Sequence, residues 1–117
     1  MSNKKIFKSI RNIPDFPKKG IQFKDITTLL EEPYIFNEVI DIFYNEFKDS
    51  KIDAIVGVES RGFIFGSPLA LKLKTKFVLA RKPGKLPSKT IRCDYDLEYG
   101  RDAMEVHIDS IKKMIEF

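Results

Sequence analysis

Two short apolar runs, separated by a stretch of helical length, constrain the fold of this chain more than any other feature. Residues 52–58 (IDAIVGV) and 76–80 (KFVLA) are rich in β-branched residues and nearly continuous in apolar character, which is typical of strands buried on both faces of a parallel sheet. Residues 63–74 (FIFGSPLALKLK), between them, have the length and the apolar face of a helix. This order predicts a right-handed βαβ unit and hence an α/β protein.

The residues on either side of this unit predict a further helix, a hairpin and an extended segment. From Pro33, a favourable first helical residue, a helix is expected to run to about Lys48. Its apolar face holds Phe36, Val39, Ile40, Phe43 and Phe47. Residues 90–97 alternate between apolar and polar, as do residues 104–108, which indicates two strands joined by a short loop. Residues 10–33, with their prolines and a Lys-Gly step, suit a turning segment that we interpret as a hood.

Length and composition allow one compact domain and exclude several classes of protein. The chain has 117 residues, of which 43% are apolar, and this is too short to suggest two domains. One cysteine, Cys93, cannot form an internal disulfide, and one histidine, His107, gives no Cys/His cluster for a metal. No apolar run approaches the roughly 18 residues of a membrane span or forms a signal peptide. We therefore expect a soluble, cytoplasmic protein that binds no metal through its own side chains.

Both strands of the βαβ unit run directly into charged loops that contain glycine. The first loop is residues 59–62 (ESRG), and the second is residues 81–89 (RKPGKLPSK). In an open α/β sheet, ligands bind beyond the carboxyl ends of the strands. Backbone amides at the start of the next helix can hold an anion there, and Arg61 offers a fork of donors that matches phosphate oxygens. The alternative for the first loop is a helix cap followed by a surface arginine.

The second loop is the more basic of the two. It carries four cations in nine residues, two prolines that limit its flexibility and a glycine that permits close backbone approach. This combination favours a polyphosphate ligand over a single anion. A solvated basic loop is the commoner outcome for a charge run, and a weak nucleic-acid patch is a second alternative. No aromatic residue is interleaved with these cations, as a single-strand binding surface would require.

Glu98 and Tyr99 occupy the turn between the two alternating strands, just before Gly100. A carboxylate on such a turn can move over a crevice, and a solvated turn residue is the alternative. His107 is expected on the polar face of its strand, opposite Val106, with no catalytic role. We interpret Cys93 as a small apolar strand residue.

Four segments together resemble the adenine phosphoribosyltransferases, which are type I phosphoribosyltransferases. They are the opening segment (residues 10–30), the first pyrophosphate loop with its helix (54–71), the second basic loop (77–87) and the flexible catalytic loop with its return strand (94–111). They follow the family's order and cover nearly the whole chain, so the match is far more specific than any single motif. The resemblance implies a partial type I phosphoribosyltransferase fold in one domain. Residues 1–33 would form its base-binding hood, and residues 34–117 its parallel-sheet core with the flexible-loop hairpin.

The resemblance also implies a reaction and its substrates. Adenine and 5-phospho-α-D-ribose 1-diphosphate would give AMP and diphosphate in purine salvage, with Mg²⁺ bound through the diphosphate of the donor. Gln22, Phe23 and Lys24 would contact adenine, Phe23 through its ring. A homodimer is the implied assembly, and neither nucleic acid nor a membrane is an expected partner.

Further residues of the substrate site carry over position by position. Three cations would bind the diphosphate: Arg61, Arg81 and Lys85. Glu59, Ser60 and Lys82 of the same loops would also belong to the substrate site. The family has a cis peptide at the position of Glu59 and Ser60. Glu98 would manage a proton on the purine ring, and Tyr99 would help to close the mobile loop over the substrates.

One part of the family's pattern is missing from the sequence. The ribose-phosphate loop, a strand followed by two acidic residues and an Ala-Thr-Gly-Gly-Thr type turn, has no counterpart, because after Lys113 the chain reads Met-Ile-Glu-Phe. We therefore expect an incomplete domain without the C-terminal strands, with exposed strand edges and apolar surface, and little or no transferase activity of this chain by itself. A non-catalytic purine-binding or dimer-partner module is the competing hypothesis, and nucleic-acid binding is a third.

Overall fold

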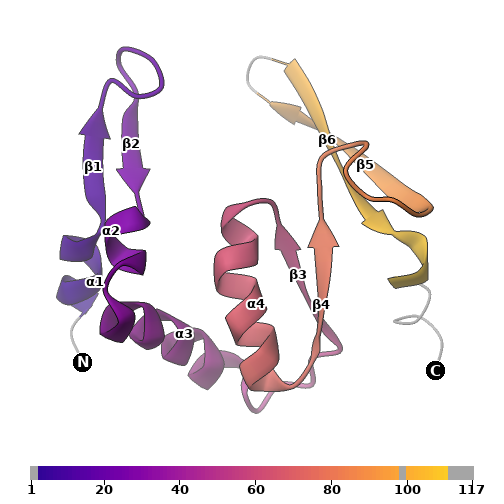
Figure 1. Ribbon diagram of the computed structural model, residues 1–117, viewed down its shortest axis with the longest axis horizontal. Helices are drawn as coiled ribbons and strands as arrows, with labels where there is room; N and C mark the ends of the chain where they lie inside the picture. The colour runs from indigo at the N-terminus through magenta and orange to yellow at the C-terminus, as the bar shows by residue number, and fades with distance from the viewer. Residues whose placement is uncertain (1–2, 98–99, 111–117) are drawn as a thin grey trace. The chain divides into compact units, whose positions relative to one another are not determined.

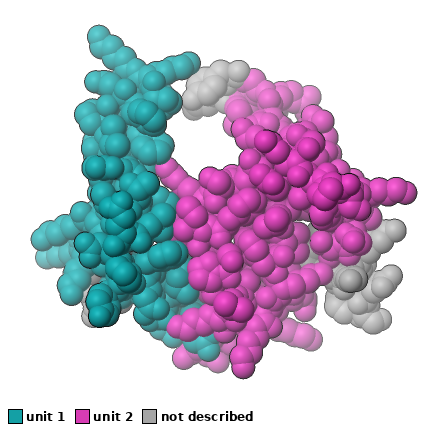
Figure 2. All heavy atoms as spheres, viewed as in Figure 1, with its two compact units in different colours: residues 1–45 teal, residues 46–117 magenta. Residues whose placement is uncertain are grey.

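The computed structural model describes residues 3–97 and 100–110 of the chain. They belong to two compact units, residues 1–45 and residues 46–117, which Figure 2 colours separately. Figure 1 labels the helices and strands along the chain. Each unit has its own elements and its own packing.

The first unit is built around a two-stranded antiparallel hairpin. Its elements are α1 (Asn3–Ser9), β1 (Arg11–Pro14), β2 (Gln22–Asp25), α2 (Thr27–Leu30) and the greater part of α3 (Pro33–Phe47). The extended, turning character predicted for residues 10–33 and the helix predicted from Pro33 are both confirmed. Helix α1 was not predicted, because a seven-residue segment rich in lysine is too short to show a full apolar stripe.

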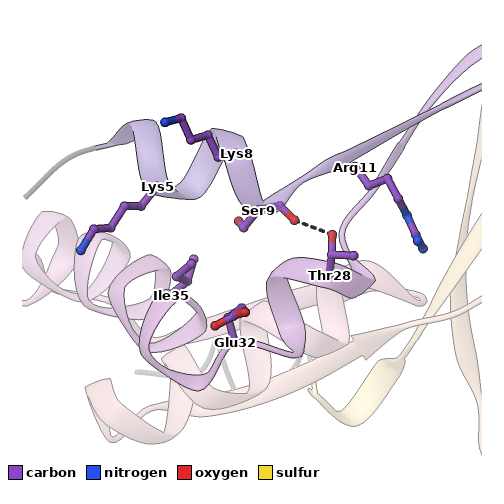
Figure 3. Close-up of a pocket in the computed structure, with 7 residues that line it drawn as sticks. All are labelled: Lys5, Lys8, Ser9, Arg11, Thr28, Glu32 and Ile35. Atoms are coloured by element: carbon purple, nitrogen blue, oxygen red, sulfur yellow. Dashed lines mark hydrogen bonds between the residues drawn. The ribbon is translucent and has the colours of Figure 1, made fainter.

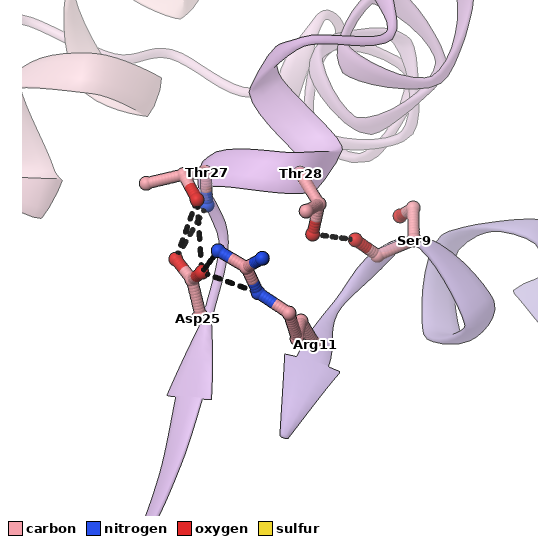
Figure 4. A network of polar contacts seen from close by, with 5 residues as sticks. All are labelled: Ser9, Arg11, Asp25, Thr27 and Thr28. Carbon is pink, nitrogen blue, oxygen red and sulfur yellow. Dashed lines mark hydrogen bonds and ion pairs between the residues drawn. The ribbon is translucent and has the colours of Figure 1, made fainter. Parts of the chain in front are cut away.

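A buried carboxylate ties the hairpin to α2 (Figure 4). Asp25 is only 5% exposed, and its carboxylate accepts hydrogen bonds from the Arg11 guanidinium and from the Thr27 backbone N–H at 2.9 Å. These bonds, that of the Thr27 amide first and that of Arg11 next, lower the pKa of Asp25 from 3.8 to about 2. Thr28 donates a further hydrogen bond to the carbonyl of Ser9. The network therefore fixes the start of α2 against the end of β2.

The second unit contains the βαβ unit that the sequence predicted. Strands β3 (Ala54–Val58) and β4 (Lys76–Ala80) are parallel, in register from Ala54 opposite Lys76 to Val58 opposite Ala80. Helix α4 (Arg61–Leu73) connects them and packs on one face of the pair (Figure 1). The packing is close enough to require glycine: a Cβ on Gly57 would lie 2.5 Å from the Phe77 ring and 2.8 Å from the Gly62 carbonyl oxygen. The predicted α/β class is thus confirmed.

The hairpin predicted after the second loop is also present. Strands β5 (Thr90–Leu97) and β6 (Gly100–His107) are antiparallel, with Thr90 opposite His107 and Leu97 opposite Gly100. The hairpin is joined to the end of β4 by a backbone bridge, in which the Arg81 N–H donates to the Glu105 carbonyl at 2.9 Å and the Glu105 N–H donates to the Arg81 carbonyl at 2.7 Å. Strand β6 therefore lies across the carboxyl end of β4.

Burial of β3 on both faces, which its apolar run predicted, is found on one face only. The face toward α4 is packed, whereas Val56 and Val58 on the opposite face are 49% and 46% exposed. Within the described residues β3 pairs with β4 alone, so the other edge of β3 has no partner strand, whereas Val78 and Ala80 of β4, on the same face as the two exposed valines, are buried. The expectation of exposed apolar surface is therefore met. None of the described helices has the length and apolar character needed to cross a membrane.

Candidate functional site

The first loop begins at the carboxyl end of β3 and leads into α4. The peptide bond between Glu59 and Ser60 is cis, as the resemblance implied. Ser60 holds the N-cap position of α4, yet its side chain makes no capping hydrogen bond. Arg61 is the first residue of the helix and its side chain is exposed. The loop thus combines the start of a helix with an arginine, and each of these two features favours the binding of an anion.

Glu59 joins the first loop to the second. Its Oε1 atom accepts a hydrogen bond from the Lys82 N–H at 2.8 Å and one from Arg81 Nε at 3.2 Å. The bond from the Lys82 amide is the main reason that the pKa of Glu59 is lowered; burial opposes it, and Arg81 and Lys85 add to it. The structure therefore brings three of the predicted site residues together through one ionised carboxylate.

The second loop contains a tight turn at its centre. The Lys85 N–H donates to the Lys82 carbonyl at 3.2 Å, which closes a four-residue turn with Pro83 and Gly84 in the middle. Gly84 has φ of +83°, so the turn has the proline and the positive φ that favour a type II turn. Lys82 and Lys85 are exposed at its two ends. The turn therefore presents two cations to solvent, 23 and 26 residues after Glu59 in the sequence.

Arg81, before the turn, is held by an aromatic side chain as well as by Glu59. Its guanidinium carbon lies 5.8 Å from the centre of the Phe63 ring, which is within the range of a cation–π contact. Phe63 in turn packs edge to face against Phe77, with ring centres 6.3 Å apart. The orientation of Arg81 thus depends on the packing of α4 against β4.

Strand β6 supplies residues to this region that were not predicted from the sequence. Glu105 Oε1 accepts a hydrogen bond from the Gly84 N–H at 3.0 Å, and His107 Nε2 accepts one from the Ser88 N–H at 3.4 Å. Lys82 Nζ lies 3.9 Å from Asp102 Oδ2. The alternation of β6 places Glu105 and His107 on one face, and this was the only signal in the sequence. It did not reveal which loop that face would meet.

The three residues expected to contact adenine lie on β2, in the first unit. Asn12 holds two of them, since its Nδ2 donates to Gln22 Oε1 at 2.7 Å and its Oδ1 accepts from Lys24 Nζ at 2.9 Å. Phe23 packs edge to face against Phe16 with ring centres 5.2 Å apart. Cross-strand bonds therefore fix the polar pair, and Phe23 packs against an aromatic ring from the turn that joins β1 and β2.

Two pockets border this unit's elements. One, of about 260 Å³, is lined by Phe7, Ile10, Lys24 and Ile26, so it includes one of the predicted adenine contacts. The other, of about 570 Å³, has a basic lining that includes Lys5, Lys8 and Arg11 (Figure 3). Figure 3 shows the Lys8 side chain directed away from the hydrogen-bonded pair Ser9 and Thr28. The larger pocket contains none of the predicted site residues.

Two predictions remain, one for the catalytic residues and one for metal binding by the protein's own side chains. Glu98 and Tyr99, the predicted catalytic residues, lie outside the described residues. Over residues 3–97 and 100–110, no three His, Cys, Asp or Glu side chains are grouped as a metal ion bound by the protein would require.

A model of the phosphoribosyl transferase domain matches residues 25–92, which is more than half of the chain, and the chain therefore belongs to this family. Within the family it is similar to proteins named adenine phosphoribosyltransferase. It is 57% identical over 102 residues to that of Anaeromyxobacter dehalogenans, a match that covers 87% of this chain and 59% of the relative. It is 58% identical over 104 residues to that of Clostridium botulinum, with 89% and 60% covered.

Solved structures give the same result. The crystal structure of adenine phosphoribosyltransferase from Thermoanaerobacter pseudethanolicus superposes with a TM-score of 0.89 at 49% identity, covering 93% of this chain and 63% of that one. The Giardia lamblia enzyme, crystallised with 9-deazaadenine, gives a TM-score of 0.84 at 42% identity, covering 92% and 60%. The predicted phosphoribosyltransferase fold is thus confirmed. The chain spans 59% and 60% of the length of the two curated relatives, from Anaeromyxobacter dehalogenans and Clostridium botulinum.

Proposed function

We propose that this chain carries the base-binding and diphosphate-binding parts of an adenine phosphoribosyltransferase, which transfers the phosphoribosyl group from its 1-diphosphate to adenine in purine salvage. The observation that carries the proposal is the joining of two basic loops at the carboxyl ends of β3 and β4 by Glu59. This is the edge of an α/β sheet at which ligands bind. The names of the similar proteins supply adenine and the transferred phosphoribosyl group.

The cations of the two loops have a clear role in such a transfer. As the bond between C1 of ribose and the diphosphate breaks, negative charge grows on the departing diphosphate and positive charge on the sugar. Arg61, Arg81 and Lys85 would stabilise the leaving group through charge-assisted hydrogen bonds. Ser60 and Lys82 would add backbone and side-chain donors from the same loops.

Mg²⁺ would be held by oxygens of the diphosphate and by water. This ion keeps several waters and commonly binds proteins through the phosphates of a substrate. Near the loops, the carboxylates of Glu59 and Glu105 already accept hydrogen bonds from loop amides. The ligands of the ion would therefore come mainly from the diphosphate of the donor and from water. When bound, the ion would add further positive charge at the leaving group.

The base would be contacted by Gln22, Phe23 and Lys24, with Phe23 stacking or packing against the purine ring. Glu98 would manage the proton on the purine, and Tyr99 would help to close the loop that excludes water from the activated sugar. We further propose that the protein is cytoplasmic, in keeping with its single cysteine, and that it forms the homodimer implied by the family resemblance.

The role of Arg61 provides the test of this proposal. A chimera would continue the chain with the C-terminal part of the Clostridium botulinum relative that lies beyond the matched segment. In this chimera, Arg61→Ala should raise the KM for the donor about tenfold to a hundredfold, because a charge-assisted contact contributes roughly 1.5 to 3 kcal/mol. The KM for adenine should change much less.

Lys51→Ala is the matched control, since it removes the same charge from an exposed residue near the opposite end of β3. Its donor KM should stay within about twofold of the wild type. If Arg61→Ala leaves the donor KM and kcat unchanged, Arg61 does not belong to the diphosphate site.

A further inference from the structure

The second loop is attached to β6 and to the residue that follows it at both ends and at two points between them. At its start, Arg81 and Glu105 exchange two backbone hydrogen bonds, of 2.9 and 2.7 Å. At its end, the Ile108 N–H donates to the Lys89 carbonyl at 2.9 Å. The loop is therefore closed at both ends by backbone bonds to β6 and to the residue that follows it.

Two side chains of β6 hold the middle of the loop. Glu105 and His107 project from the same face of the strand and accept hydrogen bonds from the Gly84 and Ser88 amides. The Glu105 bond is the shorter, at 3.0 Å against 3.4 Å, and its acceptor carries a charge. Glu105 is also half-buried, whereas Gly84 is exposed. The carboxylate thus supplies the stronger of these two restraints on the exposed turn.

The hydrogen bond from Gly84 to Glu105 restrains the residue that directly precedes Lys85. Gly84 is the third residue of the turn, with φ of +83°, and Lys85 follows it directly. Glycine gains more conformational freedom than any other residue when it is released, so a hydrogen bond to the Gly84 amide restrains the turn at its most flexible residue. Fixing the Gly84 amide therefore fixes the backbone from which the Lys85 side chain projects.

From this geometry we infer that Glu105 is a positioning residue: its carboxylate holds the second loop in the shape that binds a diphosphate, although it carries the same sign of charge as that ligand. The inference rests on the proposed function, since it takes the loop to be the diphosphate site. The charge of Glu105 and its positioning role predict opposite effects on anion affinity when the carboxylate is removed. By charge alone, removing a carboxylate near an anion site strengthens anion binding. By positioning, removing the acceptor of the Gly84 bond weakens it.

Two substitutions separate these effects in the 117-residue chain. Glu105→Ala removes both the charge and the acceptor, whereas Glu105→Gln removes the charge and keeps a carbonyl acceptor. With magnesium diphosphate as the ligand in calorimetry, Glu105→Ala should bind about tenfold more weakly than the wild type, and Glu105→Gln should bind equally or more tightly. Asp53→Ala is the matched control, an exposed residue just before β3 that carries the same charge. It should leave the affinity within about twofold.

Hydrogen exchange of the Gly84 amide, followed by NMR, gives a second readout that does not depend on the ligand. Exchange should be faster in Glu105→Ala and unchanged in Glu105→Gln and Asp53→Ala. If Glu105→Ala binds diphosphate as tightly as the wild type or more tightly, or keeps the wild-type exchange rate at Gly84, the positioning role is wrong while the diphosphate site stands. If the wild type itself fails to bind magnesium diphosphate, the proposed diphosphate site is wrong and the inference fails with it.

Discussion

Single carboxylates organise the polar backbone in both units of this protein. Asp25 receives the Thr27 amide and the Arg11 guanidinium, and Glu59 receives the Lys82 amide and Arg81. In each case an ionised acceptor satisfies a backbone donor of a turn or helix start and a cation at the same time. Such bonds are stronger than those between neutral groups, so each carboxylate determines the local course of the chain.

The lowered pKa of Asp25 predicts a dependence of stability on pH. Because the folded-state pKa is about 2 and the ordinary value is 3.8, the ionised carboxylate stabilises the fold fully above about pH 5. This contribution is lost as the pH falls through the folded-state pKa. Asp25→Asn should therefore melt several degrees below the wild type at pH 7, and the difference should narrow toward pH 2, as measured by circular dichroism.

Asp49→Asn, at an exposed position after α3, provides the control for this experiment. Its melting temperature should follow the wild type at each pH. Equal melting temperatures of Asp25→Asn and the wild type at pH 7 would show that the network around Arg11 contributes nothing to stability.

At the scale of the elements, periodicity and turn residues were sufficient to predict most of the strands of the second unit and the long helix of the first. The alternation of residues 90–97 and the apolar run at 76–80 correspond to β5 and β4, and Pro33 is the first residue of α3. Local sequence determines these elements because their side chains repeat with the period of a strand or a helix. Contacts between distant segments could not be predicted in this way. The pairing of Glu105 with Gly84, for instance, depends on how β6 meets the loop.

The packing of α4 against β3 predicts that Gly57 tolerates no side chain. A Cβ at this position would meet the Phe77 ring at 2.5 Å and the Gly62 carbonyl oxygen at 2.8 Å. Since one of these neighbours is backbone, Gly57→Ala should lower the free energy of unfolding by about 1 to 3 kcal/mol, measured by urea denaturation. Val56→Ala, on the exposed face of the same strand, should cost no more than about 0.5 kcal/mol. Similar costs for the two substitutions would contradict the packing described for Gly57.

At the scale of the whole molecule, the residues proposed to contact the substrates are divided between the two units. The residues assigned to adenine lie in residues 1–45, and the loops assigned to the diphosphate lie in residues 46–117. The sequence predicted both groups through the resemblance, whereas the contacts within each group required the structure. Val56 and Val58, exposed on the uncovered face of β3, indicate where further structure could pack.

Formation of AMP from adenine decides whether the proposed function holds. The chimera with the Clostridium botulinum C-terminal part would be incubated with adenine, the phosphoribosyl diphosphate donor and Mg²⁺, and AMP would be measured by chromatography, with guanine in place of adenine as the control. We predict AMP at about 1 s⁻¹ or faster, little product from guanine, and little or no AMP from the 117-residue chain alone. Adenine binding without turnover by the chimera would favour the non-catalytic purine-binding module instead, and equal use of guanine would contradict the assignment of adenine as the substrate.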